Sequence, residues 1–237
     1  MLMVQIAAIL ALVQTGVDTT PKRSVDISVT PYYVSADTAA DRQVEVDKNF
    51  DPLLKSDRRE DVLMARDRIR AEPALVSPIT MMVLASRLYD VGERDEAVFW
   101  FYVARNRYFS LTRVAPAYSR PAMFSGPGEF SAAMGAFGVL AGPYFNSYAF
   151  CDIANQQSIR RRAFDWTKAN PYQLVFDPKL EAAGADRQAL LDAGLEEIRT
   201  QMDKETAIVT DTKWQAEYRA KRAAAGVDAQ FCWQAKP

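Results

Sequence analysis

Histidine is absent from this chain of 237 residues. Without an imidazole there can be no Ser–His–Asp triad, no Cys–His dyad and no zinc or haem site built on histidine ligands. The sequence also lacks a glycine-rich phosphate loop, a nucleophile elbow and a cysteine or aspartate cluster at metal-ligand spacing. Chemistry by carboxylate, lysine, tyrosine or a Ser–Lys pair stays open. We therefore predict no cofactor and no metal, and we favour a protein that is not an enzyme.

An excess of charge of one sign is also missing, because the formal net charge is −1. A balanced chain creates no global field that would attract nucleic acid or an anionic membrane. The basic run Arg160–Arg162, followed by Lys168, is short, and its three adjacent side chains point around a helix instead of forming one patch. We therefore predict no nucleic-acid partner.

Long hydrophobic runs are missing as well. The apolar run Leu2–Val13 is too short to span a bilayer comfortably, and its length suits the hydrophobic region of a signal peptide. No Lys or Arg precedes it and no clean cleavage motif follows, so a buried or fraying N-terminal helix is the alternative. We interpret residues 1–17 as a signal peptide. We expect a periplasmic or secreted protein with no stable membrane span in the mature chain.

Cysteine is scarce, since only Cys151 and Cys232 occur. In an exported protein an even pair predicts a disulfide. Such a bond would also hold the hydrophobic tail Phe231–Trp233 on the body of the protein. If the chain is not exported, two buried reduced thiols are the better interpretation.

Helical patterns dominate the rest of the chain. Residues 18–54 show no helical period, so we predict an extended arm or linker there, with a short strand at Val25–Val29. Residues 55–237 predict a single helical domain, mainly α, in which six to seven helices form a bundle or a helical-repeat-like body behind the N-terminal arm. The predicted helices span residues 57–71, 77–91, 93–110, 128–141, 144–168, 186–205 and 211–226.

The segment Ser77–Ser110 predicts two helices closed by a tight turn. Ser77 and Pro78 suit a helix start, and Gly92 supplies the left-handed residue that ends the first helix. The acidic stretch Glu93–Glu96 is interpreted as the solvated start of the second helix. That helix carries Trp100 and Phe101 and is apolar nearly all round, so we expect it to be buried on several sides and to form the core.

Small and large residues in this hairpin follow a familiar spacing, at Leu84, Ala85, Leu88, Gly92, Ala97, Phe101 and Ala104. In this it resembles one tetratricopeptide-type or Sel1-type repeat. Met81 stands where the family prefers Trp, and Phe109 stands near the position where the family has a terminal Pro. Solenoids of this kind need about three repeats, and no second copy is present, so a plain helical hairpin is the alternative. The whole chain also resembles uncharacterised exported bacterial proteins, a resemblance that implies no activity.

One candidate binding site follows from helical spacing. Tyr144, Tyr148 and Asp152 lie four residues apart and would share a helix face, with Asn146 and Gln156 beside it. Polar groups in an apolar helix, just after a Gly–Pro break, predict a pocket. A buried Asp beside tyrosine hydroxyls would have a raised pKa and act as an acid or base. Alternatively, these groups satisfy one another and nearby backbone at the kink.

Three functions fit these features. The first is an exported, non-catalytic helical interaction protein that binds a protein or peptide partner, with an immunity or inhibitor role by analogy alone. The second is a carboxylate-dependent hydrolase or lyase with a pocket near Asp152, in which Asp152 or Glu96 works with a tyrosine. The third is a small-ligand carrier, which would need a large closed apolar cavity.

Overall fold

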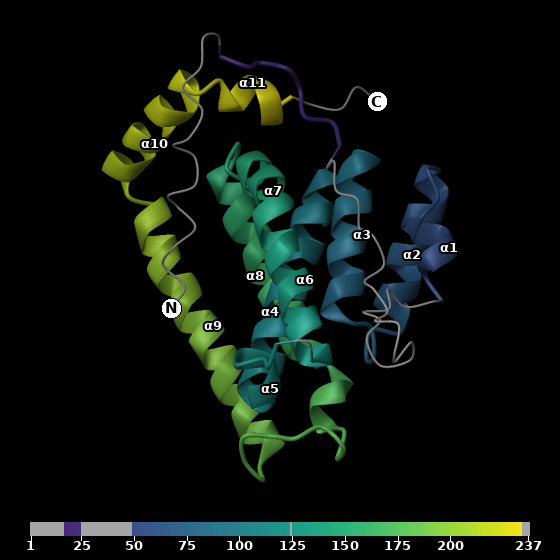
Figure 1. The fold of residues 1–237 in the computed structure, drawn as a ribbon. Coiled ribbons are helices and arrows are strands. Elements are labelled where there is room, and N and C mark those ends of the chain that lie inside the picture. Colours follow the sequence, from purple (N-terminus) through teal and green to yellow (C-terminus); the bar gives the residue numbers. More distant parts are fainter. Residues whose placement is uncertain (1–16, 25–48, 124, 234–237) are drawn as a thin grey trace.

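The computed structural model describes residues 17–24, 49–123 and 125–233. Within these ranges the chain forms helices and no strand, which confirms the mainly α class (Figure 1). The predicted strand at Val25–Val29 lies outside the described residues, as does the predicted signal peptide except for Val17. Residues 17–24 have no regular secondary structure.

Eight of the eleven α-helices in the described ranges have at least seven residues. In chain order the helices are α1 (Asp51–Leu54), α2 (Arg59–Ala71), α3 (Pro78–Asp90), α4 (Arg94–Val114), α5 (Pro116–Ser119), α6 (Gly126–Leu140), α7 (Gly142–Ala149), α8 (Ile153–Ala169), the 3-10 helix η1 (Gln173–Phe176), α9 (Arg187–Val209), α10 (Thr212–Ala224) and α11 (Val227–Phe231).

The predicted hairpin is confirmed as α3 and α4. The Ser77 side chain caps the start of α3. Gly92 has a φ of 88° after the end of α3, a conformation that glycine adopts without strain. Its N–H donates to the Tyr89 carbonyl at 3.1 Å, and the Glu93 N–H donates to the Leu88 carbonyl at 2.8 Å. These two bonds form a Schellman motif, which satisfies carbonyls that the helix end leaves free.

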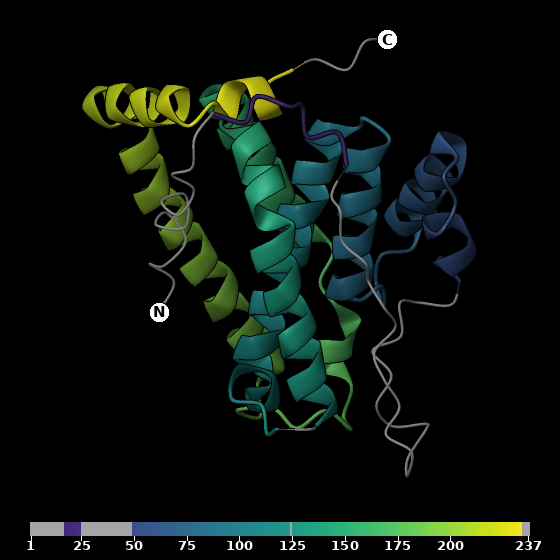
Figure 2. The ribbon, with the colours of Figure 1, turned by 45° about the horizontal axis from the view of Figure 1, so that its top comes forward.

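Helix α4 is the centre of the body. It packs against α3, α5, α7, α8 and α9, and Figures 1 and 2 show those helices around it. Trp100 and Phe101 are 0% and 1% exposed, so the prediction of a buried core helix is correct. A second apolar cluster lies at the end of α4, where Leu111 and Val114 pack with residues of η1 and α9.

Arg107 is a buried cation in the middle of α4, 1% exposed. Its Nη1 donates to the carbonyls of Pro73 and Val76 at 2.7 and 2.8 Å, and its Nη2 donates to the carbonyl of Asn170 at 2.7 Å. Burial lowers its pKa to about 10. Arg107 thus joins the α2–α3 connection and the end of α8 to the central helix through backbone carbonyls.

The predicted single helix at 144–168 is wrong. Helix α7 ends at Ala149, and α8 begins at Ile153. Between them Asp152 adopts extended backbone angles, and its side chain accepts the N–H of Asn155 at 3.0 Å. A capping Asp therefore starts a new helix where apolar spacing alone predicts a continuous one. The predicted break at Gly142–Pro143 is confirmed, because α6 ends at Leu140.

Two segments far apart in the sequence lie together at one end of the bundle, where α11 packs on α7 and residues 17–24 run beside it toward α3 (Figures 1 and 2). We call residues 17–24 and 226–233 the cover. The Lys22 N–H donates to the Gln230 carbonyl at 2.8 Å, which joins the two segments. The predicted docking of the hydrophobic tail is therefore confirmed as far as the described residues extend.

Gly226 allows the close crossing of the two segments. Its φ of 64° lies in the left-handed region, and a Cβ atom placed on it would be 2.2 Å from a methyl carbon of Val17. Any side chain here would meet both backbone strain and a clash. The cover therefore depends on glycine at this position.

Candidate functional site

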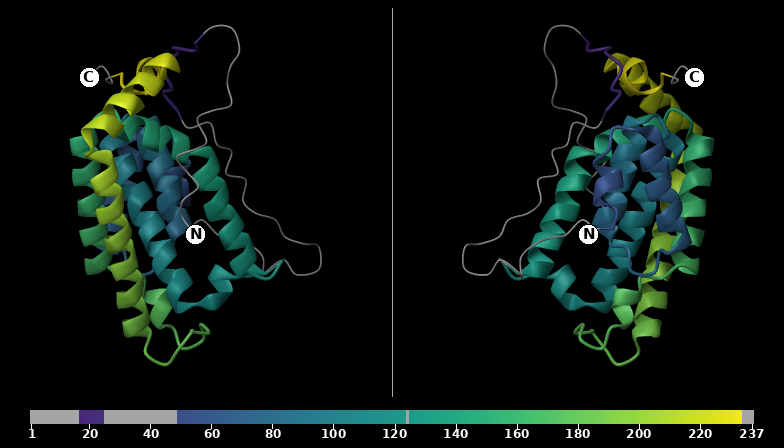
Figure 3. Two further views of the ribbon diagram at one scale, coloured as in Figure 1. Left: turned by 90° about the vertical axis from the view of Figure 1, so that its left-hand side faces the viewer. Right: turned by 90° about the vertical axis from the view of Figure 1, so that its right-hand side faces the viewer.

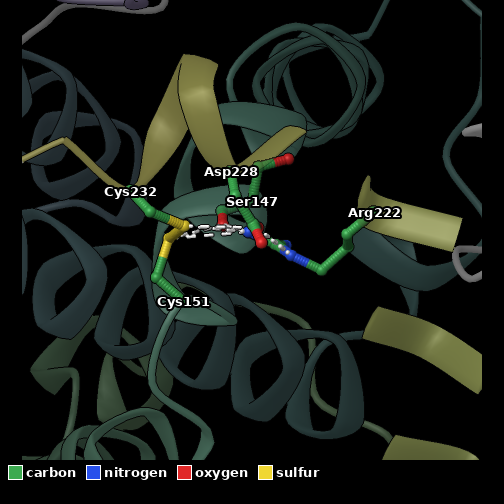
Figure 4. A network of polar contacts seen from close by, with 5 residues as sticks. All are labelled: Ser147, Cys151, Arg222, Asp228 and Cys232. Atoms are coloured by element: carbon green, nitrogen blue, oxygen red, sulfur yellow. Dashed lines mark hydrogen bonds and ion pairs between the residues drawn. A yellow bond between two sulfur atoms is a disulfide. The ribbon is translucent and has the colours of Figure 1, made fainter. Parts of the chain in front are cut away.

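The described cysteines, Cys151 and Cys232, form the predicted disulfide (Figure 4). The bond joins the α7–α8 connection to the residue directly after α11. Cys151 is exposed and Cys232 is half-buried. The disulfide therefore fixes the C-terminal part of the cover, and a reductant can reach it from solvent.

Arg222 of α10 lies against the disulfide, 4% exposed (Figure 4). Its Nη2 donates to the Cys232 sulfur at 3.2 Å, to the Cys151 sulfur at 3.5 Å and to the Ser147 carbonyl at 3.0 Å. Its Nε donates to a carboxylate oxygen of Asp228 at 2.7 Å. One guanidinium thus connects α7, α10, α11 and both sulfur atoms.

Tyr144 and Tyr148 share a face of α7, as predicted, and both meet Tyr89 of α3. The ring centroids of Tyr144 and Tyr148 lie 6.2 and 6.4 Å from that of Tyr89, in edge-on geometry. Tyr144 also contacts Phe231 of the cover, with centroids 5.8 Å apart. These tyrosines therefore form an aromatic wall beneath the cover.

The other three predicted site residues do not join this wall. Asp152 is exposed and caps α8, so the prediction that it lies buried beside tyrosine hydroxyls is wrong. Gln156 is buried and donates to the Tyr102 hydroxyl at 2.7 Å. Asn146 is half-buried in α7, where its carbonyl accepts the N–H of Phe150.

The carboxylate beside a tyrosine hydroxyl is that of Asp95, and not that of Asp152 as the sequence predicted. The Tyr148 hydroxyl donates to it at 3.0 Å, and the Asn155 side-chain amide donates to both of its oxygens at 3.1 Å. Burial, with the nearby Asp95 charge, raises the pKa of Tyr148. The Tyr148 hydroxyl is therefore a fixed hydrogen-bond donor at neutral pH.

Arg94, the first residue of α4, is the residue that sequence reasoning missed. It is 4% exposed, and its guanidinium carbon lies 3.4 Å from the centroid of the Trp233 ring. The corresponding distances to Tyr89 and Tyr148 are 5.1 and 5.5 Å. Nη1 donates to the Trp233 carbonyl at 2.9 Å, whereas Nε and Nη2 have no hydrogen-bond partner among the residues that the structure describes.

Burial lowers the pKa of Arg94. The prediction that all of Glu93–Glu96 is a solvated helix start is therefore wrong at Arg94, although Asp95 is exposed. The local pattern of charges resembles an ordinary helix start. Trp233, which covers Arg94, lies too far along the chain for any helical spacing to reveal the contact.

Helix α6 presents a second feature, an exposed face without charge. Val139 and Leu140 are 68% and 53% exposed, and Ala132 and Gly135 are also exposed. No charged residue occurs between Phe130 and Ala149. Figure 3 shows α6 at one side of the bundle. A Cβ atom on Gly135 would have no neighbour within 4 Å among the described residues.

The described residues contain neither a group of side chains placed to hold a metal ion nor a helix that could span a membrane. Over residues 17–24, 49–123 and 125–233, no group of three or more Cys, Asp or Glu side chains is placed to hold a metal ion. None of the helices in these ranges combines the length and the apolar character needed to cross a bilayer.

Fold and site together define an all-helical protein with a disulfide-fixed cover. The chain is 32% identical over 228 residues to an uncharacterized protein of Haemophilus influenzae, and the match covers 96% of this chain and 86% of the other. The chain therefore belongs to the same family as that protein. No family model matches the sequence, a tetratricopeptide or Sel1 model included. No solved structure matches it.

Proposed function

We propose that this chain is a non-catalytic interaction protein that binds a protein or peptide partner through the exposed face of α6. The observation that carries the proposal is the position of Val139 and Leu140, which are largely exposed on a face without charge. Contiguous exposed apolar surface on a folded protein is typical of a binding site. Burial of one such side chain by a partner stabilises a complex by roughly 1.5–3 kcal/mol.

The composition of α6 favours a helix or extended segment as the part of the partner that binds. Ala132 and Gly135 are small and lie one helical turn apart on the exposed face. Small residues let a second backbone approach closely, while Val139 and Leu140 supply apolar area at the end of the helix. An immunity or inhibitor role agrees with this arrangement and rests on analogy alone.

The disulfide supports a periplasmic or secreted location, because such bonds form and persist in oxidising compartments. In this proposal residues 1–17 direct export. The partner would then be another exported protein.

A site-specific crosslinking experiment tests the proposal. A photoreactive amino acid replaces Val139 in the full chain, in its native cells, and a matched chain carries it at Ile208 of α9, which is 45% exposed. We expect one discrete adduct from position 139 and none of that mass from position 208. The adduct's partner is identified by mass spectrometry and purified. Val139→Glu should then weaken its binding about tenfold or more, since a charge replaces a buried apolar contact.

The opposite outcome is equally clear. The same adduct from both positions, or unchanged affinity of the Val139→Glu chain for the purified partner, would contradict a binding role for α6. Ile208→Glu is the control for the added charge, and it should leave the affinity unchanged.

One observation favours the alternative function, that of a carboxylate-dependent hydrolase or lyase. Asp152 accepts from the backbone N–H of Asn155 and Asp95 accepts from its side-chain amide, so two carboxylates flank one residue, and Asp95 also accepts from the Tyr148 hydroxyl. Both carboxylates belong to exposed residues. If this is an active site, Asp95→Asn abolishes turnover of a substrate while the fold, followed by circular dichroism, is retained.

A further inference from the structure

The cover supplies hydrogen-bond acceptors to two groups that lie beneath it, the Arg94 guanidinium and the Tyr89 hydroxyl. The Trp233 carbonyl accepts from Arg94, and the Lys22 carbonyl accepts from the Tyr89 hydroxyl at 3.2 Å. Both acceptors are backbone oxygens of the cover. Without the cover, the Tyr89 hydroxyl and the Arg94 guanidinium would face the same opening without these partners.

Arg94 has no anionic partner among the described residues, and two of its nitrogens are unsatisfied. Asp95, its neighbour in sequence, accepts from Tyr148 and Asn155 instead. A buried guanidinium normally has a carboxylate or a set of carbonyls around it, because an unpartnered buried cation is costly. Among the described residues, the arrangement therefore has the donors of an anion site and no carboxylate that accepts from them.

We propose that Arg94 and Tyr89 form a binding site for a carboxylate ligand, which the cover closes while Cys151–Cys232 is oxidised and opens when the disulfide is reduced. The carboxylate would accept from the Arg94 nitrogens and the Tyr89 hydroxyl in place of the two cover carbonyls. Edge-on rings of Tyr144 and Tyr148 border this position, so an aromatic or apolar group next to the carboxylate fits the site.

The position of the disulfide allows this bond to hold the cover closed. Cys232 directly precedes Trp233, so the covalent bond holds the residue that stacks on Arg94. The other contacts of the cover are non-covalent: the Lys22–Gln230 hydrogen bond, the Tyr144–Phe231 ring pair, the stacking of Trp233 on Arg94 and the Arg222–Asp228 ion pair are examples. A single contact of this kind typically contributes less than a disulfide does. Loss of the covalent bond therefore removes the strongest single constraint on the cover.

Reduction requires a dithiol reductant, which the proposal includes as a co-reactant. A reductant thiolate attacks the sulfur of exposed Cys151, and Cys232 leaves as a thiolate beside the Arg222 guanidinium. The second reductant thiol then resolves the mixed disulfide. Two protein thiols and one reductant disulfide result, so two electrons and two protons pass to the protein. Arg222 favours the first step because a nearby cation stabilises the departing thiolate.

The test is titration of the full chain with benzoate and, separately, with inorganic phosphate, followed by calorimetry. We expect no binding to the oxidised chain and measurable benzoate binding to both the reduced chain and the Cys151→Ser/Cys232→Ser chain. Addition of Arg94→Gln to the latter should weaken binding about tenfold or more, since hydrogen bonds to a charged group are strong. Binding of phosphate alone would assign the site to a phosphate ligand and contradict the carboxylate assignment.

A second variant keeps the proposal testable if the serine chain does not fold. Trp233→Ala leaves the disulfide intact and removes the ring from Arg94, so it should allow benzoate binding under oxidising conditions. Trp214→Ala, in α10, is the matched control and should not. Absence of benzoate binding to Trp233→Ala and to the reduced chain would overturn the proposal, as would equal affinity of the Arg94→Gln chain.

Discussion

Arg107 and Arg94 are both buried cations on α4, yet their surroundings differ. Arg107 donates to three backbone carbonyls from two separate connections of the body. Arg94 donates to one carbonyl, which belongs to the C-terminal tail, and lies among three aromatic rings. The body thus supplies acceptors to both terminal nitrogens of Arg107 and leaves its Nε without one in the described part of the chain, whereas Arg94 depends on a segment that one disulfide holds. This contrast teaches that burial alone does not distinguish a structural arginine from one available for binding.

Methionine substitution at each arginine should have the largest effect on the free energy of unfolding, and it tests directly whether the two arginines differ. Arg107→Met leaves three carbonyls without their donor, and each unsatisfied buried group costs about 1–3 kcal/mol, so we expect a loss of about 4 kcal/mol of unfolding free energy. Arg94→Met should cost about 1 kcal/mol or less, since it removes one hydrogen bond together with an unpaired buried cation. Urea denaturation of both chains measures the difference. Equal losses would contradict the distinction.

A smaller change in the free energy of unfolding is expected at alkaline pH. Burial raises the pKa of Tyr172, which packs near Arg107, and of Tyr89, beneath the cover, to about 12. The ordinary value of 10 applies in the unfolded chain, so between pH 10 and pH 12 the unfolded chain loses these protons first. Stability therefore falls as pH rises through this range, by up to about 1.4 kcal/mol per pH unit for each tyrosine.

Phenylalanine substitutions separate the contributions of Tyr172 and Tyr89 to this loss of stability. Tyr172→Phe and Tyr89→Phe should each make the alkaline loss less steep in the oxidised chain, measured by denaturant midpoints at several pH values. In the Cys151→Ser/Cys232→Ser background, Tyr89 is uncovered, so Tyr89→Phe should no longer change the slope. Tyr172→Phe should still do so. A persistent effect of Tyr89→Phe in that background would show that the cover stays closed.

The sequence predicted the parts of the fold that depend on local signals. The Gly92 turn, the buried Trp100 and the helix start after Ser77 all follow from capping chemistry and periodicity, and the structure confirms them. The disulfide was predictable because only two cysteines occur. The helical hairpin that carried the resemblance to a single repeat is present, and no tetratricopeptide or Sel1 family model matches the chain.

The candidate site was predicted only in part. Tyr144 and Tyr148 were placed on one face by their spacing, and that placement holds within α7. Asp152 was misplaced because its capping role outweighs apolar periodicity at that point. The contacts of Arg94 with Trp233 and of Arg107 with Asn170 join residues far apart in sequence, so no local pattern indicates them.

Fluorine NMR of the full chain labelled with 5-fluorotryptophan tests most directly the claim that the cover opens separately from the body. The chain has four tryptophans, and the Trp233 resonance is assigned from a Trp233→Phe chain. On reduction, we expect this resonance to move to the position of a solvated indole, while those of buried Trp100 and of Trp166 stay unchanged. An unmoved Trp233 resonance in a chain with two free thiols, or a joint shift of all four, would contradict it.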